Sequence, residues 1–181
     1  MELTVAGVRV VLSGMRVAGE RRGPEAKRAG VALLQSLVRE LTGAESTIGR
    51  RCDVCGSDQH GRPVATEAVR LSLSYAEGAV IAAAALTAEA AAIGIDIERA
   101  DDAQAQLTEL ATLFAPRPAP SLAAWTRIEA VLKADGRGML ADPTDVVLDA
   151  DAGGLADSVM MRLADVPAPT DFVAAIAVLP G

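Results

Sequence analysis

A short segment of alternating isoleucines and acids places the strongest constraint on how this chain can fold. In Gly94-Ile95-Asp96-Ile97-Glu98, apolar side chains alternate with carboxylates. Successive side chains of a β-strand point to opposite faces of the sheet, so Ile95 and Ile97 are expected in the core and Asp96 and Glu98 on the other face. The segment therefore predicts a strand that presents two carboxylates side by side.

A second block, Trp125 to Lys133, supplies a third acid and a cation. Its pattern is typical of a helix, in which a spacing of four residues places Glu129 and Lys133 one turn apart on one face. Three acids that converge without a cysteine or several histidines suit a hard divalent ion, and magnesium keeps coordination positions for waters and substrate phosphates. Asp96, Glu98 and Glu129 are therefore candidate ligands of Mg²⁺, or of Mn²⁺, with Lys133 beside a phosphate. The alternative is a solvated strand end and an ordinary stabilising pair on a helix surface.

Charge is unevenly divided between the two halves of the chain. The formal net charge of the 181 residues is −7, but residues 1–90 carry 11 Lys and Arg against 10 Asp and Glu, and residues 91–181 carry 6 against 14. This acidic total argues against nucleic acid as a partner, because phosphate backbones require clustered basic charge. The first half nevertheless has enough cations for a small polyanion, namely Arg21, Arg22, Lys27, Arg28, Arg50, Arg51 and Arg62. We expect phosphates to bind to the first half and the metal to the second.

The chain has no segment that predicts membrane insertion or export. No uninterrupted apolar stretch approaches the roughly 20 residues needed to span a bilayer. The start, Met1 to Thr4, lacks a basic region followed by an apolar one. We expect a cytoplasmic monomer without a membrane partner.

The order of elements predicts an α+β fold. Helices are expected at residues 24–43, 103–114 and about 121–134, with Ser121 as an N-cap and Gly43 and Gly136 as stops. Strands are expected at residues 3–12, 69–75, 79–86, 94–98, 146–148, 159–163 and 172–179, and an ordered loop at 44–64. This succession suggests two similar α+β lobes in a pseudo-twofold pair, each a small antiparallel sheet packed with a long helix. The lobes would comprise residues 1–88 and 89–181.

Four blocks and a short Gly-x-Gly motif together resemble the Sfp-type 4'-phosphopantetheinyl transferases. Gly-Ile-Asp-Ile-Glu at residues 94–98 is followed by Trp-Thr-x-x-Glu-Ala-x-x-Lys at 125–133 and by a Gly-x-Gly at 136–138. Upstream, His60-Gly61-Arg62-Pro63 is similar to the family's Gly-Lys/Arg-Pro segment, and Leu71 to Tyr75 is similar to its Leu-Ser-His strand. Each block alone is a weak signal, but their joint order is fairly specific. With the first helix, the resemblance covers roughly residues 20–140.

The resemblance implies transfer of the phosphopantetheine arm of coenzyme A to a serine of an acyl or peptidyl carrier protein, with release of 3',5'-ADP. It implies Mg²⁺ held by Asp96, Glu98 and Glu129, with Glu129 also taking the serine proton. Lys133 would hold the pyrophosphate and assist departure of the product. Contacts to coenzyme A are implied for Arg28, Gly61, Arg62, Pro63, Ser74, Tyr75 and Lys133, with Lys27 as a second candidate beside Arg28.

Two positions depart from the family pattern. Where the family has histidine after Leu-Ser, this chain has Tyr75, whose hydroxyl can donate but brings no positive charge near neutral pH. Where the family has lysine before the helix glutamate, this chain has Ile128. Neither change removes an implied metal ligand, so transfer is expected. The departures motivate an alternative, a degenerate relative that binds coenzyme A or a carrier protein without transfer, and a third interpretation is a metal-dependent phosphohydrolase acting on another pyrophosphate.

Cys52 and Cys55 form half of a zinc-binding pattern, with His60 as a candidate third ligand. No second pair of cysteines follows, and nearby thiols in a cytoplasmic protein usually stay reduced. The favoured interpretation of His60 is therefore a role in ordering the loop or in contacting the nucleotide edge. Trp125 is assigned to packing.

Overall fold

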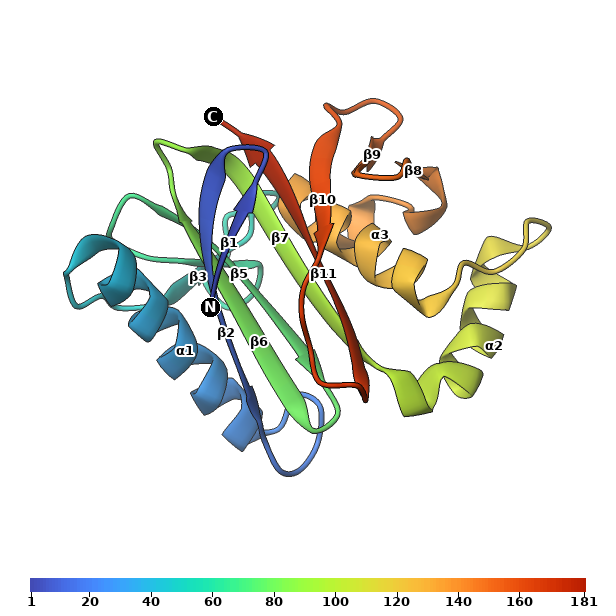
Figure 1. Cartoon of the computed structure of the whole chain (residues 1–181), viewed down its shortest axis with the longest axis horizontal. Coiled ribbons are helices and arrows are strands. Elements are labelled where there is room, and N and C mark those ends of the chain that lie inside the picture. Colours follow the sequence, from blue (N-terminus) through green and yellow to red (C-terminus); the bar gives the residue numbers. More distant parts are fainter.

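Two antiparallel sheets, each covered by one long helix, form the body of the protein (Figure 1). This computed structural model describes the backbone of residues 1–181 and the side chains of all residues except 102–106 and 139. The mixed α+β class expected from the order of elements is confirmed. None of the helices in the described part of the chain combines the length and apolarity needed to cross a membrane.

The first sheet has the strand order β1-β2-β6-β5. Its strands are β1 (Glu2–Val5), β2 (Val8–Arg16), β5 (Val69–Ala76) and β6 (Ala79–Leu86). Helix α1 (Pro24–Thr42) packs on β6, where small alanine side chains allow a close approach. The helix begins at Pro24 and stops where Gly43 adopts a left-handed conformation, with φ of 74°. A small two-stranded sheet, β3 (Gly49–Arg51) and β4 (Arg62–Val64), lies between α1 and β5 in the chain.

The second sheet has the order β7-β11-β10-β9-β8. Its strands are β7 (Ala90–Arg99), β8 (Val146–Leu148), β9 (Ala152–Leu155), β10 (Met161–Asp165) and β11 (Phe172–Pro180). Helix α2 (Ala103–Phe114) and helix α3 (Leu122–Asp135) follow β7, and α3 packs on β7 and β11. Short 3-10 turns occupy Ala100–Asp102, Gly138–Leu140 and Pro143–Asp145. Ser121 caps α3 by accepting a hydrogen bond from the Ala124 amide at 3.2 Å, as the sequence predicted.

The two sheets meet along β5 and β7, where no strand pairing joins them in the described backbone. Serine side chains connect the two strands instead. Ser72 Oγ accepts a hydrogen bond from the Ile95 amide at 2.9 Å, and Ser74 Oγ donates to Asp96 Oδ1 at 2.7 Å. Both serines are buried. This serine seam sets the position of the first candidate acid relative to the first half of the chain.

Alternation in β7 places its side chains as expected. Ile95 and Ile97 are buried in a core that also contains Val10, Leu12 and Ile176. Gly94 faces α3, and Asp96 and Glu98 follow it on the same side of the strand. The core between the sheets therefore holds β7 firmly and directs its acids toward the helix.

Three local features differ from the sequence-based expectations. Residues 3–12 are not one strand but part of a hairpin that turns at Ala6 and Gly7, whose φ values are 51° and 83°. The segment 44–64 contains β3 and β4 as well as loop, and β9 lies in a segment for which no strand was expected. The hairpin of β5 and β6, with its turn at Glu77 and Gly78, agrees with the prediction.

Candidate active site

Asp96 and Lys133 form an ion pair that joins β7 to α3. Lys133 Nζ lies 2.5 Å from Asp96 Oδ1 and 2.7 Å from Ser74 Oγ, and it donates to the Ile95 carbonyl at 3.1 Å. Asp96 is only 1% exposed, so its charge requires such partners, because an isolated buried carboxylate is strongly disfavoured. The pair therefore fixes the end of α3 against the strand that carries two of the acids.

Glu98 is bonded to a cation from the first half of the chain. Arg21 Nη2 donates to Glu98 Oε1 at 2.9 Å, and Arg21 Nε donates to the Tyr75 carbonyl at 2.6 Å. Arg21 thus connects the segment before α1 to both β5 and β7. The sequence identified Arg21 only as one of several clustered cations, since a contact across 77 positions leaves no local signal.

Glu129 lies on α3 within electrostatic range of the strand acids. Burial raises the pKa of Glu129 above its usual range, and the negative charges of Asp96 and Glu98 raise it further, against the opposing effect of Lys133 and Arg21. A carboxyl group with a raised pKa holds its proton more readily at neutral pH than a free glutamate does. The arrangement gives the site one proton-accepting group that is stronger as a base than an exposed carboxylate.

The donor chemistry of the three acids fits a hard divalent ion. Asp96 Oδ2 is buried and has no hydrogen-bond partner, and such an atom beside further carboxylates is well suited to Mg²⁺ or Mn²⁺. In the described side chains, however, Asp96, Glu98 and Glu129 do not bring one oxygen each within 4.8 Å of one another. Lys133 and Arg21 bond two of these acids instead. Joint binding of one ion therefore requires the side chains to rearrange.

A cleft of about 700 Å³, here called the basic cleft, has Lys133 on its wall. Four further cations line it, namely Arg22, Lys27, Arg50 and Arg62. No aspartate or glutamate occurs among its described lining residues. A concave surface with this charge suits a ligand that carries several phosphates.

Most of the residues expected to contact coenzyme A line the basic cleft, but two do not. The expected residues that line the cleft are Gly61, Arg62, Pro63, Tyr75 and Lys133. Ser74 is buried in the serine seam, and Arg28 is exposed outside the cleft. Lys27 lines the cleft in place of Arg28, because neighbouring helical residues point about 100° apart. Burial raises the pKa of Tyr75, so its phenol stays protonated and can donate.

A second hollow of about 770 Å³, here called the acidic groove, contains two of the candidate metal ligands. It is lined by Glu20, Arg21, Arg22, Glu98, Glu109, Leu110, Leu113, Trp125 and Glu129. Trp125 also packs edge-on against Phe114, with ring centroids 6.4 Å apart, which agrees with its assignment to packing. Arg22 lines both hollows, so the basic cleft and the acidic groove adjoin at this residue.

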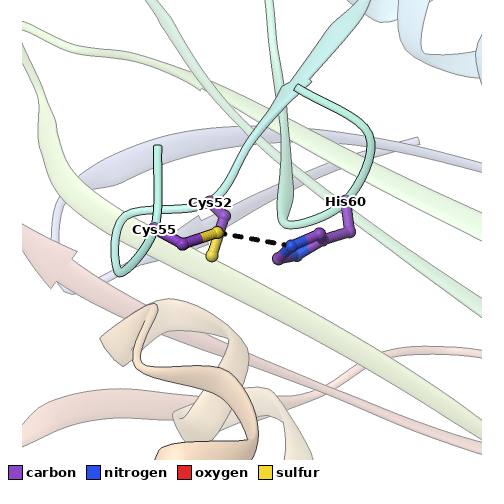
Figure 2. A group of neighbouring side chains, drawn as sticks. All are labelled: Cys52, Cys55 and His60. Carbon is purple, nitrogen blue, oxygen red and sulfur yellow. Dashed lines mark hydrogen bonds between the residues drawn. The ribbon is translucent and has the colours of Figure 1, made fainter. Parts of the chain in front are cut away.

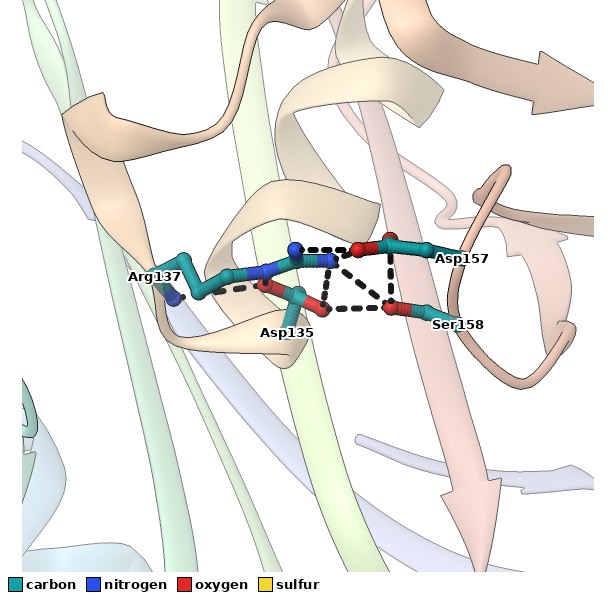
Figure 3. Close-up of polar contacts among 4 residues, drawn as sticks. All are labelled: Asp135, Arg137, Asp157 and Ser158. Carbon is teal, nitrogen blue, oxygen red and sulfur yellow. Dashed lines mark hydrogen bonds and ion pairs between the residues drawn. The ribbon is translucent and has the colours of Figure 1, made fainter.

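An arginine clamp holds the end of α3 (Figure 3). Arg137 Nε donates to Asp135 Oδ1 at 2.6 Å, and Arg137 Nη2 donates to Asp157 Oδ1 at 2.9 Å and to Ser158 Oγ at 2.7 Å. Hydrogen bonds from Arg137 lower the pKa of Asp157 to about 2. Burial alone would raise the pKa of Asp135, but the hydrogen bonds from Arg137 outweigh that effect and lower it. The clamp ties the helix that carries Glu129 and Lys133 to the loop after β9.

Comparison with protein-family models finds no match for the sequence, and comparison with curated proteins finds none.

Proposed function

We propose that this protein is an Sfp-type 4'-phosphopantetheinyl transferase, which moves the phosphopantetheine arm of coenzyme A to a serine of an acyl or peptidyl carrier protein. The observation that carries this proposal is the meeting of two hollows of opposite charge. A cleft with five cations adjoins a groove that contains Glu98 and Glu129. A pyrophosphate bound across their junction would have cations on one side and acids for a divalent ion on the other.

The arrangement of the two halves also favours this family. Each half contributes an antiparallel sheet and one long helix, α1 of 19 residues in the first and α3 of 14 residues in the second. We infer that residues 1–88 and 89–181 are lobes of similar plan in a pseudo-twofold pair. The basic cleft has walls from both lobes, since Tyr75 and Lys133 line it.

In the proposed reaction, coenzyme A binds with its phosphates in the basic cleft. Lys27, Arg50 and Arg62 would hold the nucleotide phosphates, and Lys133 would hold the pyrophosphate and stabilise the charge on the departing 3',5'-ADP. Asp96, Glu98 and Glu129 would hold a divalent ion, which would neutralise phosphate charge. Glu129 would accept the proton of the carrier serine as the oxygen attacks the phosphorus.

A direct assay tests the proposal. The protein would be incubated with coenzyme A, Mg²⁺ and several apo carrier domains, and mass spectrometry would measure addition of the phosphopantetheine arm. Glu129→Gln should abolish the transfer, whereas Glu25→Gln, on the exposed first turn of α1, should leave it unchanged. Failure to modify any carrier under these conditions would reject the enzymatic proposal.

A second candidate function is binding of coenzyme A without transfer. Two observations favour it: Lys133 already pairs with Asp96, and Ile128 is buried in the core beneath α2 rather than adding a cation. Calorimetry with coenzyme A separates the two functions. Coenzyme A binding that saturates at one equivalent, while every carrier protein stays unmodified, would support binding without transfer.

A further inference from the structure

Cys52, Cys55 and His60 converge at the surface of the loop between β3 and β4 (Figure 2). One ligand atom from each residue lies within 4.8 Å of the other two. Cys55 Sγ and His60 Nε2 are 3.4 Å apart. In a tetrahedral zinc site with bonds of about 2.3 Å to sulfur and 2.0 Å to nitrogen, these two atoms would be roughly 3.5 Å apart. The side chains thus already stand at a spacing suited to one shared ion.

Main-chain hydrogen bonds shape the turn that brings Cys52 and Cys55 together. The Gly56 amide donates to the Cys52 carbonyl at 2.9 Å, and the Cys52 amide donates to the Ser57 carbonyl at 2.9 Å. Gly56 has a φ of 72°, a left-handed conformation that glycine adopts without a steric penalty. The turn therefore places Cys55 beside Cys52 through main-chain bonds that do not depend on the thiols.

His60 is held near the cysteines by the close approach of the chain at the next residue. A Cβ at Gly61 would overlap the Arg51 carbonyl oxygen, so only glycine allows this contact between the loop and β3. Arg50 Nη1 also donates to the Gly61 carbonyl at 3.0 Å. Both contacts fix the end of the loop against the strand that leads into Cys52, which returns His60 to the cysteine turn.

We propose that Cys52, Cys55 and His60 bind one Zn²⁺ ion, with water as the fourth ligand, and that this ion fixes the loop that borders the basic cleft. Sulfur and imidazole ligands select a borderline-soft ion and differ from the all-oxygen set of Asp96, Glu98 and Glu129. Asp53, the other ligand-bearing side chain in the turn, is paired with Arg62 at 3.1 Å, so the fourth position falls to water. Coordination converts both thiols to thiolates and releases two protons to solvent, with His60 neutral and no change of oxidation state.

The position of the ion gives it a structural consequence. His60, Gly61 and Arg62 line the basic cleft, so an ion at His60 would order one wall of that cleft. The loop residues 52–60 belong to none of the hydrophobic cores formed by the described residues. Loss of the ion is therefore expected to loosen the loop and leave the two sheets folded.

Cobalt substitution tests the site directly. The reduced chain, without an affinity tag, would be titrated with Co²⁺ in the absence of oxygen. We expect saturation at one equivalent, with a thiolate-to-cobalt charge-transfer band and the visible bands of tetrahedral Co²⁺, and one equivalent of Zn²⁺ should remove both signals. Removing a residue that only hydrogen-bonds to a metal ligand costs about 10–100-fold in metal affinity. Cys55→Ser and His60→Gln remove the ligands themselves, so they should weaken binding by more than roughly 100-fold.

The matched control is Asp58→Asn, which removes an exposed carboxylate of the same loop and should keep affinity and spectrum unchanged. Circular dichroism of each variant would establish that the sheets remain folded. Hydrogen exchange of residues 52–61 should slow when Zn²⁺ is added to the parent chain and not when it is added to Cys55→Ser. A titration without thiolate bands, or equal affinity in Cys55→Ser, would overturn the proposal. These readouts involve no coenzyme A, so they are independent of the proposed transferase activity.

Discussion

Gly94 should be irreplaceable because α3 lies directly on its backbone. A methyl group at this position would overlap the Ala130 carbonyl oxygen and lie 2.5 Å from the Ala134 amide nitrogen, whereas ordinary Cβ contacts begin at 3.4 Å. Both obstacles are backbone atoms of the helix, so no change of rotamer can relieve them. In Gly94→Ala the helix must move away by about 0.9 Å or more.

This movement has a cost that can be measured. Forcing a methyl group into a packed core costs about 1–3 kcal/mol, and the backbone overlap places Gly94→Ala near the upper end. For a chain of this size, about 3 kcal/mol corresponds to a fall of roughly 6–12 °C in Tm. The same displacement would carry the backbone of Lys133 away from Asp96 and strain their 2.5 Å contact. A misplacement of this size can lower a reaction rate by about 100-fold, so the proposed transfer should slow by about that factor.

Urea unfolding at neutral pH measures the free energy, and the carrier-modification assay measures the rate. Gly49→Ala is the matched control, because a methyl group there would lie 3.7 Å from Val64 Cγ2, an ordinary contact in a strand. The control should be neutral or slightly more stable, since alanine loses less backbone entropy than glycine on folding. If Gly94→Ala unfolds within about 0.5 kcal/mol of the parent chain, the inferred close packing of α3 on β7 is wrong.

Three further predictions concern the charged groups of the site. Lys133→Met should destabilise the protein by about 3–5 kcal/mol in urea unfolding, because it leaves Asp96 buried without its cation. Adding Asp96→Asn to this variant should recover most of the lost stability. If the costs of the two substitutions simply add, the two side chains do not act as a pair. Glu129 has a raised pKa, so its contribution to stability is complete below its unfolded pKa of about 4.3 and is lost as pH rises through the folded value. Glu129→Gln should therefore be more stable than the parent at pH 8 and gain little at pH 4, and equal gains at both pH values would argue against the raised pKa. Asp157 has a pKa of about 2, so it stabilises the protein above its unfolded pKa of about 3.9, and this contribution is lost as pH falls through 2. In Arg137→Ala, the pKa of Asp157 measured by NMR titration should rise toward about 4. An unchanged pKa would mean that Arg137 does not act on this acid.

The parts of the fold that follow from local periodicity could be predicted from the sequence. The alternation in residues 94–98 correctly separated Ile95 and Ile97 from the two acids, because one face of β7 is buried in a core. Ser121 and Gly136 marked the ends of α3, since capping is decided by the residues at the ends themselves. The fold class and the main helices and strands follow from such local signals.

Features that depend on distant packing could not be predicted in this way. Strand β9 contains Gly153 and Gly154, which argue against a strand locally, yet a Cβ at Gly153 would crowd Leu148, Leu163 and Val131. Ala6 has a positive φ in a turn, where glycine or asparagine would have been the recognisable signal. Both positions obey constraints that only the folded chain imposes.

The candidate site was predictable in residue type and less so in geometry. The three acids and Lys133 were identified from spacing, but the bonds that Arg21 and Lys133 make to two of those acids were not. The choice of Lys27 over Arg28 depends on the rotation of α1 against β6, which sequence spacing does not specify. The convergence of His60 with the cysteine turn likewise depends on the contact of Gly61 with Arg51.

The serine seam between β5 and β7 joins the two sheets through side chains and not through a strand ladder. A strand ladder locks its partners in fixed steps, whereas hydroxyl groups can rotate and exchange partners without breaking the sheets on either side. Behind the seam, one hydrophobic core continues from β2 and β6 to β7 and β11 and holds the two sheets together. Ser72 and Ser74 thus help to place the acids of β7 beside the first half of the chain, together with Arg21, which bonds both Glu98 and the Tyr75 carbonyl.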